Sequence, residues 1–200
     1  MENTHLPGQY TGKSVDYHRS LDLATQAEAT ALFEEIRMRL LQVNRWHLIT
    51  EGPSAEFCIV DETGNPVEKT VQQGDCIRID IPGPGLPSSH GYDWVKVEEI
   101  VEEHHEDGKR LLLSLRPSPD PTNNTDDTAH FFKALATSSF LLEQKQNNIL
   151  LHYAGRNEVI NTDNESNWDN IRNFLVGLGA KMGASYPQWK ALVDGLAQVR

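Results

Sequence analysis

Five consecutive residues, His90-Gly91-Tyr92-Asp93-Trp94, combine an imidazole, a phenol, a carboxylate and an indole. They follow Pro82 to Pro87, a loop in which prolines remove backbone donors and glycines remove steric restraint. Aromatic side chains beside such a loop are typical of the mouth of a ligand site. The segment therefore predicts a small-molecule site, although Tyr92 and Trp94 would equally complete a core beneath the loop.

A second set of reactive groups follows an apolar strand pattern near residue 150. Arg156 and Glu158 lie two residues apart, so a regular strand places them on one face. An ion pair between them is the simpler interpretation. The functional interpretation is an arginine anchor for a ligand carboxylate, because a guanidinium binds a carboxylate through two parallel hydrogen bonds. His152 shares this face, and a turn at Asn147-Asn148 would set it opposite Glu143.

The segment from Glu102 to Asp107 contains the densest group of potential metal ligands in the chain. Neighbouring strand residues point to opposite faces, whereas a metal site needs three or four converging ligands. We therefore expect a solvated hairpin tip and no metal site. His130, next to Phe131 and Phe132, is more typical of a core histidine than of a general base.

Several catalytic motifs are absent from the sequence: a glycine-rich phosphate loop ending in Gly-Lys-Ser/Thr, G-x-S-x-G, H-E-x-x-H and paired C-x-x-C. Their absence argues against nucleotide, α/β-hydrolase and zinc chemistry. We accordingly expect no cofactor.

Acidic residues outnumber basic residues 29 to 18, which gives a net charge of −11. Such a surface repels phosphate backbones and anionic headgroups, so we expect neither a nucleic acid nor a membrane as partner. Residues 1–20 contain no apolar run of signal-peptide length. Only Cys58 and Cys76 occur, too few for a disulfide framework. These features predict a cytoplasmic protein with two buried thiols.

Hydrophobic periodicity indicates the elements that would position these groups. Residues 20–43 carry one apolar stripe of helical spacing, and Thr25 with Glu28 has the form of a capping box. A period of two predicts strands over residues 55–61, 67–71, 76–81, 93–103, 109–116, 138–145 and 149–160, with a bulge at Glu98-Glu99. Helical spacing returns in residues 166–182 and 185–196.

Strands that cluster between helical ends, without βαβ alternation, favour the α+β class. We expect a curved antiparallel sheet or partial barrel of about six to seven strands, with one N-terminal helix and two C-terminal helices packed on it. A chain of 200 residues has the size of a single domain. We therefore treat residues 1–200 as one domain, with residues 1–20 as a candidate extended or disordered tail.

The function that the sequence favours is non-enzymatic small-molecule binding, with a pocket mouth near the 82–94 loop. The predicted ligand contacts are His90, Tyr92, Asp93, Trp94, Arg156 and Glu158. One alternative is an enzyme whose acid and base groups are among His90, Asp93, His130, Arg156 and Glu158. Another is a protein-interaction module, such as a homodimer formed through the C-terminal helices.

Overall fold

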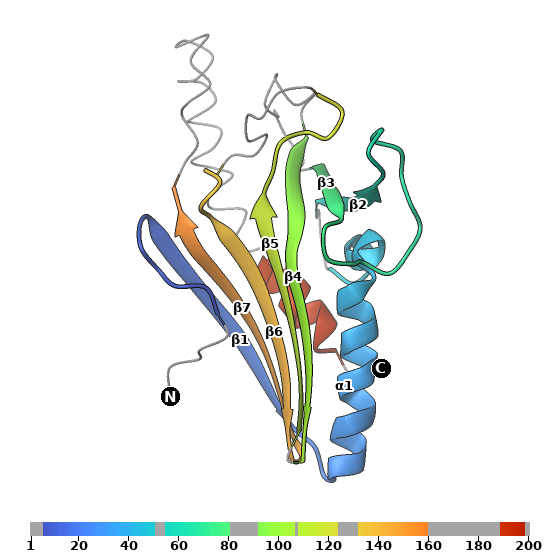
Figure 1. Ribbon diagram of the computed structural model, residues 1–200. Helices are drawn as coiled ribbons and strands as arrows, with labels where there is room; N and C mark the ends of the chain where they lie inside the picture. The colour runs from blue at the N-terminus through green and yellow to red at the C-terminus, as the bar shows by residue number, and fades with distance from the viewer. Residues whose placement is uncertain are drawn as a thin grey trace.

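The computed structural model describes residues 6–50, 55–80, 92–106, 108–123, 132–159 and 189–198. The elements are β1 (Lys13–Asp22), α1 (Gln26–Leu41), the 3-10 helix η1 (Val43–Leu48), β2 (Glu56–Val60), β3 (Cys76–Asp80), β4 (Asp93–His105), β5 (Gly108–Pro117), β6 (Thr137–Lys145) and β7 (Asn148–Glu158). A further helix spans residues 189–196 and is red in Figure 1. Among the described residues, no helix is long and apolar enough to cross a membrane.

All seven strands form one antiparallel sheet in the order β1-β7-β6-β5-β4-β3-β2. The long strands curve, and α1 and the helix of residues 189–196 lie on the same side of them (Figure 1). The predicted α+β class and strand number are therefore confirmed. The first of the two expected C-terminal helices, residues 166–182, lies outside the described residues.

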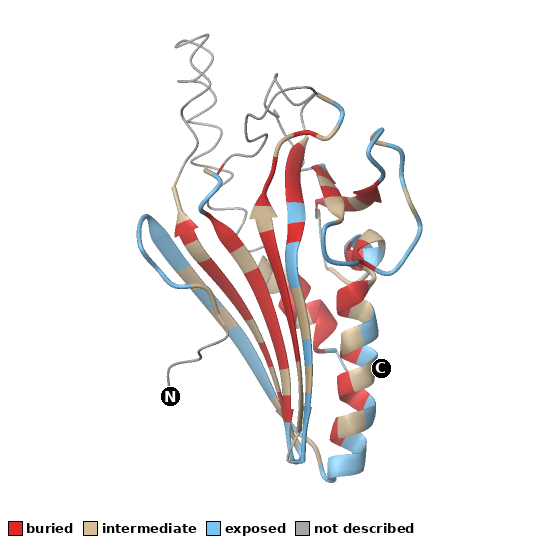
Figure 2. Cartoon of the chain, in the orientation of Figure 1, coloured by how far each residue is buried: buried red, intermediate tan, exposed pale blue. Residues whose placement is uncertain are grey.

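The sheet has two distinct faces, which we call inner and outer. The inner face carries the main core, in which strand side chains pack against both helices: Leu111, Leu113, Leu115, Phe140, Leu142, Leu151 and Tyr153 of the sheet with Phe33, Ile36 and Leu40 of α1 and Leu192, Val193 and Leu196 of the last helix. Each such side chain contributes about 1.5–3 kcal/mol when fully buried. Figure 2 shows buried residues along the central strands and exposed ones along β1.

Helix α1 begins at the capping box that the sequence predicts. The Thr25 Oγ1 atom accepts a hydrogen bond from the Glu28 backbone N–H at 3.2 Å, and the Glu28 carboxylate accepts the Thr25 N–H at 3.2 Å. The helical pattern that the sequence shows over residues 20–43 therefore begins too early, because Ser20 and Asp22 belong to β1.

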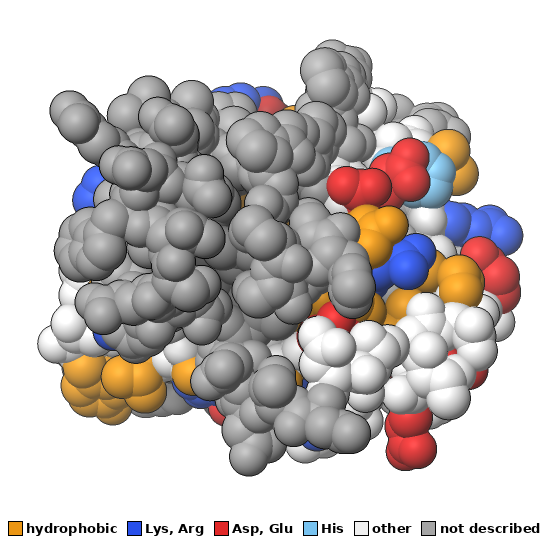
Figure 3. Space-filling model, turned by 90° about the horizontal axis from the view of Figure 1, so that it is seen from above, with side chains coloured by type: hydrophobic (Ala, Val, Ile, Leu, Met, Phe, Trp, Pro, Cys, Tyr) orange, Lys and Arg blue, Asp and Glu red, His pale blue; other side chains and the backbone are white. Residues whose placement is uncertain are grey.

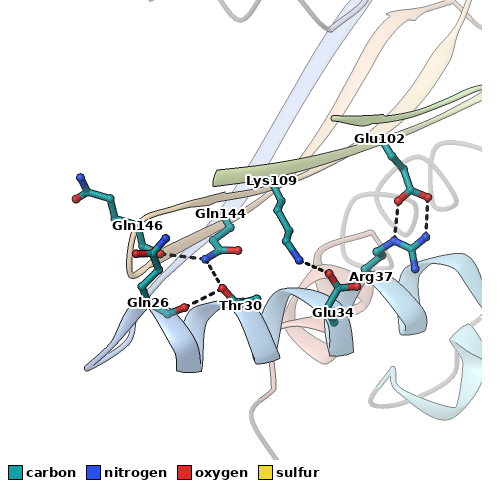
Figure 4. A network of polar contacts seen from close by, with 8 residues as sticks. All are labelled: Gln26, Thr30, Glu34, Arg37, Glu102, Lys109, Gln144 and Gln146. Atoms are coloured by element: carbon teal, nitrogen blue, oxygen red, sulfur yellow. Dashed lines mark hydrogen bonds and ion pairs between the residues drawn. The ribbon is translucent and has the colours of Figure 1, made fainter. Parts of the chain in front are cut away.

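Polar contacts fix one side of α1 to three strands (Figure 4). Arg37 binds both carboxylate oxygens of Glu102 on β4 at 2.7 and 2.8 Å, and Lys109 of β5 binds Glu34 at 2.6 Å. The Gln144 amide of β6 donates to Thr30 Oγ1 at 2.9 Å. These contacts set the position of α1 across the inner face.

Strand β1 corrects the expectation for residues 1–20. Residues 13–20 are not a tail but part of an edge strand that pairs with β7 from Lys13 to Asp22. Edge strands carry charged side chains that discourage pairing with other chains, so they lack a strong alternation of apolar and polar residues. In β1 only Val15, Tyr17 and Leu21 pack against the core.

The partner of β2 also differs from the prediction. The predicted strands over residues 55–61 and 67–71 follow one another across a turn at residues 62–66, which favours a hairpin, whereas β2 pairs with β3 along its whole length, from Glu56 opposite Asp80 to Val60 opposite Cys76. The predicted partner returns along β2 only briefly: Val60 and Pro66 form one bridge, and the Val67 N–H donates to the Ile59 carbonyl at 2.8 Å. Proline has no backbone N–H, which prevents a continuous ladder there. The predicted bulge in β4 is confirmed by the register shift between Val97 and Glu99.

The turn between β6 and β7 lies one residue earlier than predicted. It contains Gln146, whose φ is 54°, so Lys145 pairs with Asn148. This shift moves every cross-strand pair by two residues and keeps each side chain on its face. His152 is consequently opposite Leu141, and not opposite Glu143 as we expected.

Candidate functional site

The predicted site residues fall into separate groups. His90 and His130 lie outside the described residues. Tyr92, Asp93 and Trp94 stand at the start of β4, while Arg156 and Glu158 end β7. Both places are at the upper end of the sheet in Figure 1.

Trp94 completes a small second core on the outer face. It is 3% exposed and packs with Val60, Cys58, Cys76 and Tyr92. Asp93 is also buried, at 7% exposure, and pairs with Ile79, whose side chain belongs to the main core. Trp94 and Asp93 therefore belong to opposite faces of β4, as strand alternation requires.

Arg156 lies on the outer face and binds a carboxylate of β1. Its Nη1 and Nη2 atoms donate to the two carboxylate oxygens of Asp16 at 2.9 and 2.7 Å, and His152 Nε2 lies 2.8 Å from Asp16 Oδ1. Burial alone raises the pKa of Asp16, but the hydrogen bonds from Arg156 and His152 outweigh it and hold the pKa below its usual value. The predicted arginine anchor thus already holds a carboxylate of the chain itself.

The expectation that Arg156 and Glu158 share a face is wrong, because β7 contains a bulge between them. β1 pairs Lys13 with Glu158 but Val15 with Gly155, which leaves one extra residue on β7. Asn157 has a φ of 55°, in the left-handed region that asparagine tolerates better than most residues. Bulges of this kind re-aim the following side chain.

The segment before β1 holds this bulge in place. Asn157 is 5% exposed and hydrogen-bonds four successive residues: its Oδ1 accepts from the backbone N–H groups of Tyr10 at 2.7 Å and Thr11 at 3.2 Å, its Nδ2 donates to the Gly8 carbonyl at 2.9 Å, and its backbone N–H donates to Gln9 Oε1 at 2.9 Å. Hydrogen bonds from the segment before β1 therefore hold both the side-chain amide and the backbone N–H of the strained residue.

The bulge brings the Glu158 carboxylate to the inner face beside a buried phenol. Both side-chain oxygens lie directly over Gly155. If this glycine carried a Cβ atom, that atom would lie 2.4 Å from Glu158 Oε1 and 3.2 Å from Tyr153 Oη. Ser138 Oγ lies 3.2 Å from the same Tyr153 Oη. We call Ser138, Tyr153 and Glu158 the Glu158 site.

The environment of the Glu158 site raises the pKa of its carboxyl towards neutral pH. Burial raises the pKa of Glu158 to about 6, although the positive charges of Lys13 and Arg156 act in the opposite direction. Within the described part of the chain, no group donates a hydrogen bond to this carboxylate. Near neutral pH it is therefore able to accept a hydrogen bond and to exchange a proton.

Aromatic rings form the base of the site. The Trp189 ring stacks on Tyr153 with centroids 5.3 Å apart and an interplanar angle of 19°, and Phe140 lies 5.3 Å from Tyr153. Trp189 comes from the last helix and Phe140 from β6, so two layers of the fold meet beneath the Tyr153 hydroxyl.

The raised pKa of Glu158 predicts how stability depends on pH. The folded state binds the proton more tightly than the unfolded chain, whose pKa is near 4.5, so this contribution is present at low pH and is lost as pH rises through about 6. Solvent screening at this partly exposed group limits the effect to about 1 kcal/mol. We expect Glu158→Gln to gain stability over the natural chain between pH 5 and 7.5 in urea unfolding. A constant difference across this range would contradict the assignment.

Two residues of the Glu158 site, Ser138 and Tyr153, were not foreseen, and neither was the bulge at Asn157. Ser138 and Tyr153 fit ordinary strand patterns and carry no local signal. A glycine and an asparagine near the end of a strand, as at Gly155 and Asn157, are typical of a bulge and were the available indication.

The described surface that is visible from above, on the side of α1, β2 and β3, has no single sign of charge (Figure 1, Figure 3). Seen from above, acidic, basic, histidine and hydrophobic side chains adjoin one another along the right-hand edge (Figure 3). Two carboxylate–imidazole pairs meet among the described residues, Asp16 with His152 at 2.8 Å and Glu103 with His105 at 3.4 Å, and we predicted none of these four residues as an acid or base of an enzyme.

No family model and no curated protein matches the sequence. Solved structures with similar folds include the hypothetical protein jhp0584 from Helicobacter pylori, at 13% identity over 93% of this chain and 86% of that chain, with a TM-score of 0.49. A START superfamily protein from Mycobacterium smegmatis matches at 11% identity over 90% and 97% of the two chains, with a TM-score of 0.36.

Truncated norcoclaurine synthase from Thalictrum flavum matches at 9% identity over 97% of this chain and 100% of that chain, with a TM-score of 0.39. Similarity at this level does not carry over a ligand or an activity. The functional argument therefore rests on the geometry of the chain itself.

Proposed function

We propose that the protein is a small-molecule-binding domain whose ligand contacts the Glu158 site, between the inner face of the sheet and the helix of residues 189–196. One observation carries the proposal. A partly buried carboxylate, re-aimed by a bulge, lies beside the Tyr153 hydroxyl without a hydrogen bond from the described residues.

The energetic cost of this arrangement supports a binding role. Glu158 is only partly buried, so its desolvation is incomplete, but it still raises the pKa of the carboxyl, and Asn157 in the left-handed region adds strain. The Asn157 hydrogen bonds maintain the bulge that causes this cost. Such strain is typical of sites whose missing partner is a ligand.

The groups present define the class of ligand. Trp189 is the partly exposed ring of the aromatic stack and offers apolar surface, while Tyr153 and Phe140 are buried behind it; Glu158 offers an acceptor. An aromatic or other flat apolar molecule that carries one N–H or O–H donor satisfies both. Trp94 lies on the outer face and takes no part in this site.

A neutral dye tests the proposal. N-phenyl-1-naphthylamine has an aromatic body and one N–H donor, and its fluorescence rises in apolar surroundings. We expect saturable binding of the dye to the natural chain and about tenfold weaker binding to Glu158→Ala. One hydrogen bond to a charged group contributes about 1.4 kcal/mol or more to binding, and a loss of about 1.4 kcal/mol raises the dissociation constant about tenfold. Fluorescence titration at pH 7.5 measures both.

The matched control is Glu106→Ala, at an exposed glutamate at the tip of the β4–β5 hairpin. It should bind the dye like the natural chain. Equal affinity for Glu158→Ala and the natural chain, or no saturable binding to either, would refute the proposed site.

A further inference from the structure

Beyond the proposed inner-face site and independently of it, we infer that the outer face carries a second site, for a small oxyanion such as a carboxylate or phosphate, formed by Arg78, Trp94 and Ser118. These three residues lie side by side in one row across the sheet, each at the cross-strand position next to the other. Arg78 of β3 is directly opposite Trp94 of β4, and the Ser118 N–H donates to the Trp94 carbonyl at 3.0 Å, which extends the β4–β5 pairing by one residue.

Arg78 differs from most arginines in the described chain. Six others hold a carboxylate: Arg19, Arg37, Arg39, Arg110, Arg116 and Arg156. Arg78 makes no ion pair or hydrogen bond within the described residues, and its guanidinium carbon lies 4.7 Å from the centre of the Tyr92 ring. Stacking on a ring leaves the N–H groups at the guanidinium edge free to bind an anion bidentately.

The neighbours of Arg78 add buried donors that have no partner. Five buried side-chain polar atoms lack a hydrogen bond in the described structure, and two of them are Trp94 Nε1 and Ser118 Oγ. Trp94 is 3% exposed and Ser118 is 6% exposed. An indole N–H only donates, and leaving it unpaired in a buried position costs about 1–3 kcal/mol. An acceptor in this row would remove that cost.

The donor set selects the chemistry of the occupant. A guanidinium and an indole N–H are donors only, and a hydroxyl is able to donate, so an oxyanion fits and a cation does not. The net charge of −11 disfavours anions over the surface as a whole. Saturable anion binding would therefore reflect these local donors. The exposed carboxylates of Glu56 and Asp80 follow along the same face, and neither binds Arg78.

The Trp94 indole N–H reports directly on the proposed site. In a ¹H–¹⁵N spectrum of the labelled full chain, Trp94→Phe identifies its signal by the loss of one indole peak. We expect that signal to shift saturably when sodium phosphate or sodium acetate replaces sodium chloride at constant ionic strength. Saturation by acetate alone indicates a carboxylate ligand, saturation by phosphate alone a phosphoryl group, and saturation by both a general oxyanion site.

Variants at two positions, Arg78 and Arg45, separate this site from general charge effects. Arg78→Met keeps an apolar stem beside Tyr92 and should weaken anion binding at least tenfold. Arg78→Lys should recover part of the lost affinity. Arg45→Met removes an exposed arginine of η1 and should change nothing. A shift that never saturates, or that persists unchanged in Arg78→Met, would mean an adventitious ion only and would overturn the inference. Neither result depends on Glu158.

Discussion

Trp189→Ala should lower the free energy of unfolding by about 3 kcal/mol. The indole packs on three rings at once: its centroid lies 5.3 Å from Tyr153, 5.5 Å from Phe140 and 5.7 Å from Phe57. Truncation of a buried tryptophan costs about 3–5 kcal/mol. Trp189 is only partly buried, so we expect a loss near the lower end of this range. For a chain of this size the melting temperature should fall by about 6–12 °C, measurable by calorimetry.

The control for this prediction is Met38→Ala, because Met38 on α1 is 57% exposed and its removal should change stability by less than about 0.5 kcal/mol. If Trp189→Ala keeps its melting temperature but loses the dye, Trp189 is a recognition residue. The helix of residues 189–196 would then not be the structural element described above.

Local patterns in the sequence were sufficient for much of the fold. The capping pair Thr25 and Glu28 marks the start of α1, and the alternation in β3, β5 and β7 identifies their core faces. These features depend on residues within a few positions of one another. Hydrophobic burial then fixes the register wherever one face of a strand is apolar.

The features that could not be predicted depend on contacts between distant residues. The carboxylate that binds Arg156 is Asp16, which is 140 residues away, and β1 has too little apolar contrast to reveal itself as a strand. The face of Glu158 depends on the positive φ of Asn157, which residues 8–11 stabilise. A regular strand would have left Glu158 beside Arg156. One extra residue in β7 therefore decides what this end of the sheet is able to bind.

Gly195→Ala should destabilise the protein by about 2 kcal/mol, although the same change in an isolated helix stabilises it by about 1 kcal/mol. A Cβ atom at this position would lie 1.9 Å from the Ile49 carbonyl oxygen and 2.8 Å from its carbon. The obstacle is backbone just after η1, so no side-chain rotation relieves it and the helix must move outward. That movement would also strain the bonds from Arg39 to the Leu196 carbonyl, at 3.3 Å, and to the Gln198 carbonyl, at 2.8 Å.

Ala191→Gly in the same helix provides the matched comparison. Helix propensity alone predicts opposite changes in the free energy of unfolding for the two variants. Ala191→Gly would lower it by about 1 kcal/mol, and Gly195→Ala would raise it by as much. Because overpacking against a rigid neighbour costs about 1–3 kcal/mol or more, we expect both variants to unfold at lower urea concentration than the natural chain. A gain in stability for Gly195→Ala would show that the last helix does not press against the end of η1. The aromatic stack beneath Glu158 would then lack the support that this close contact gives it.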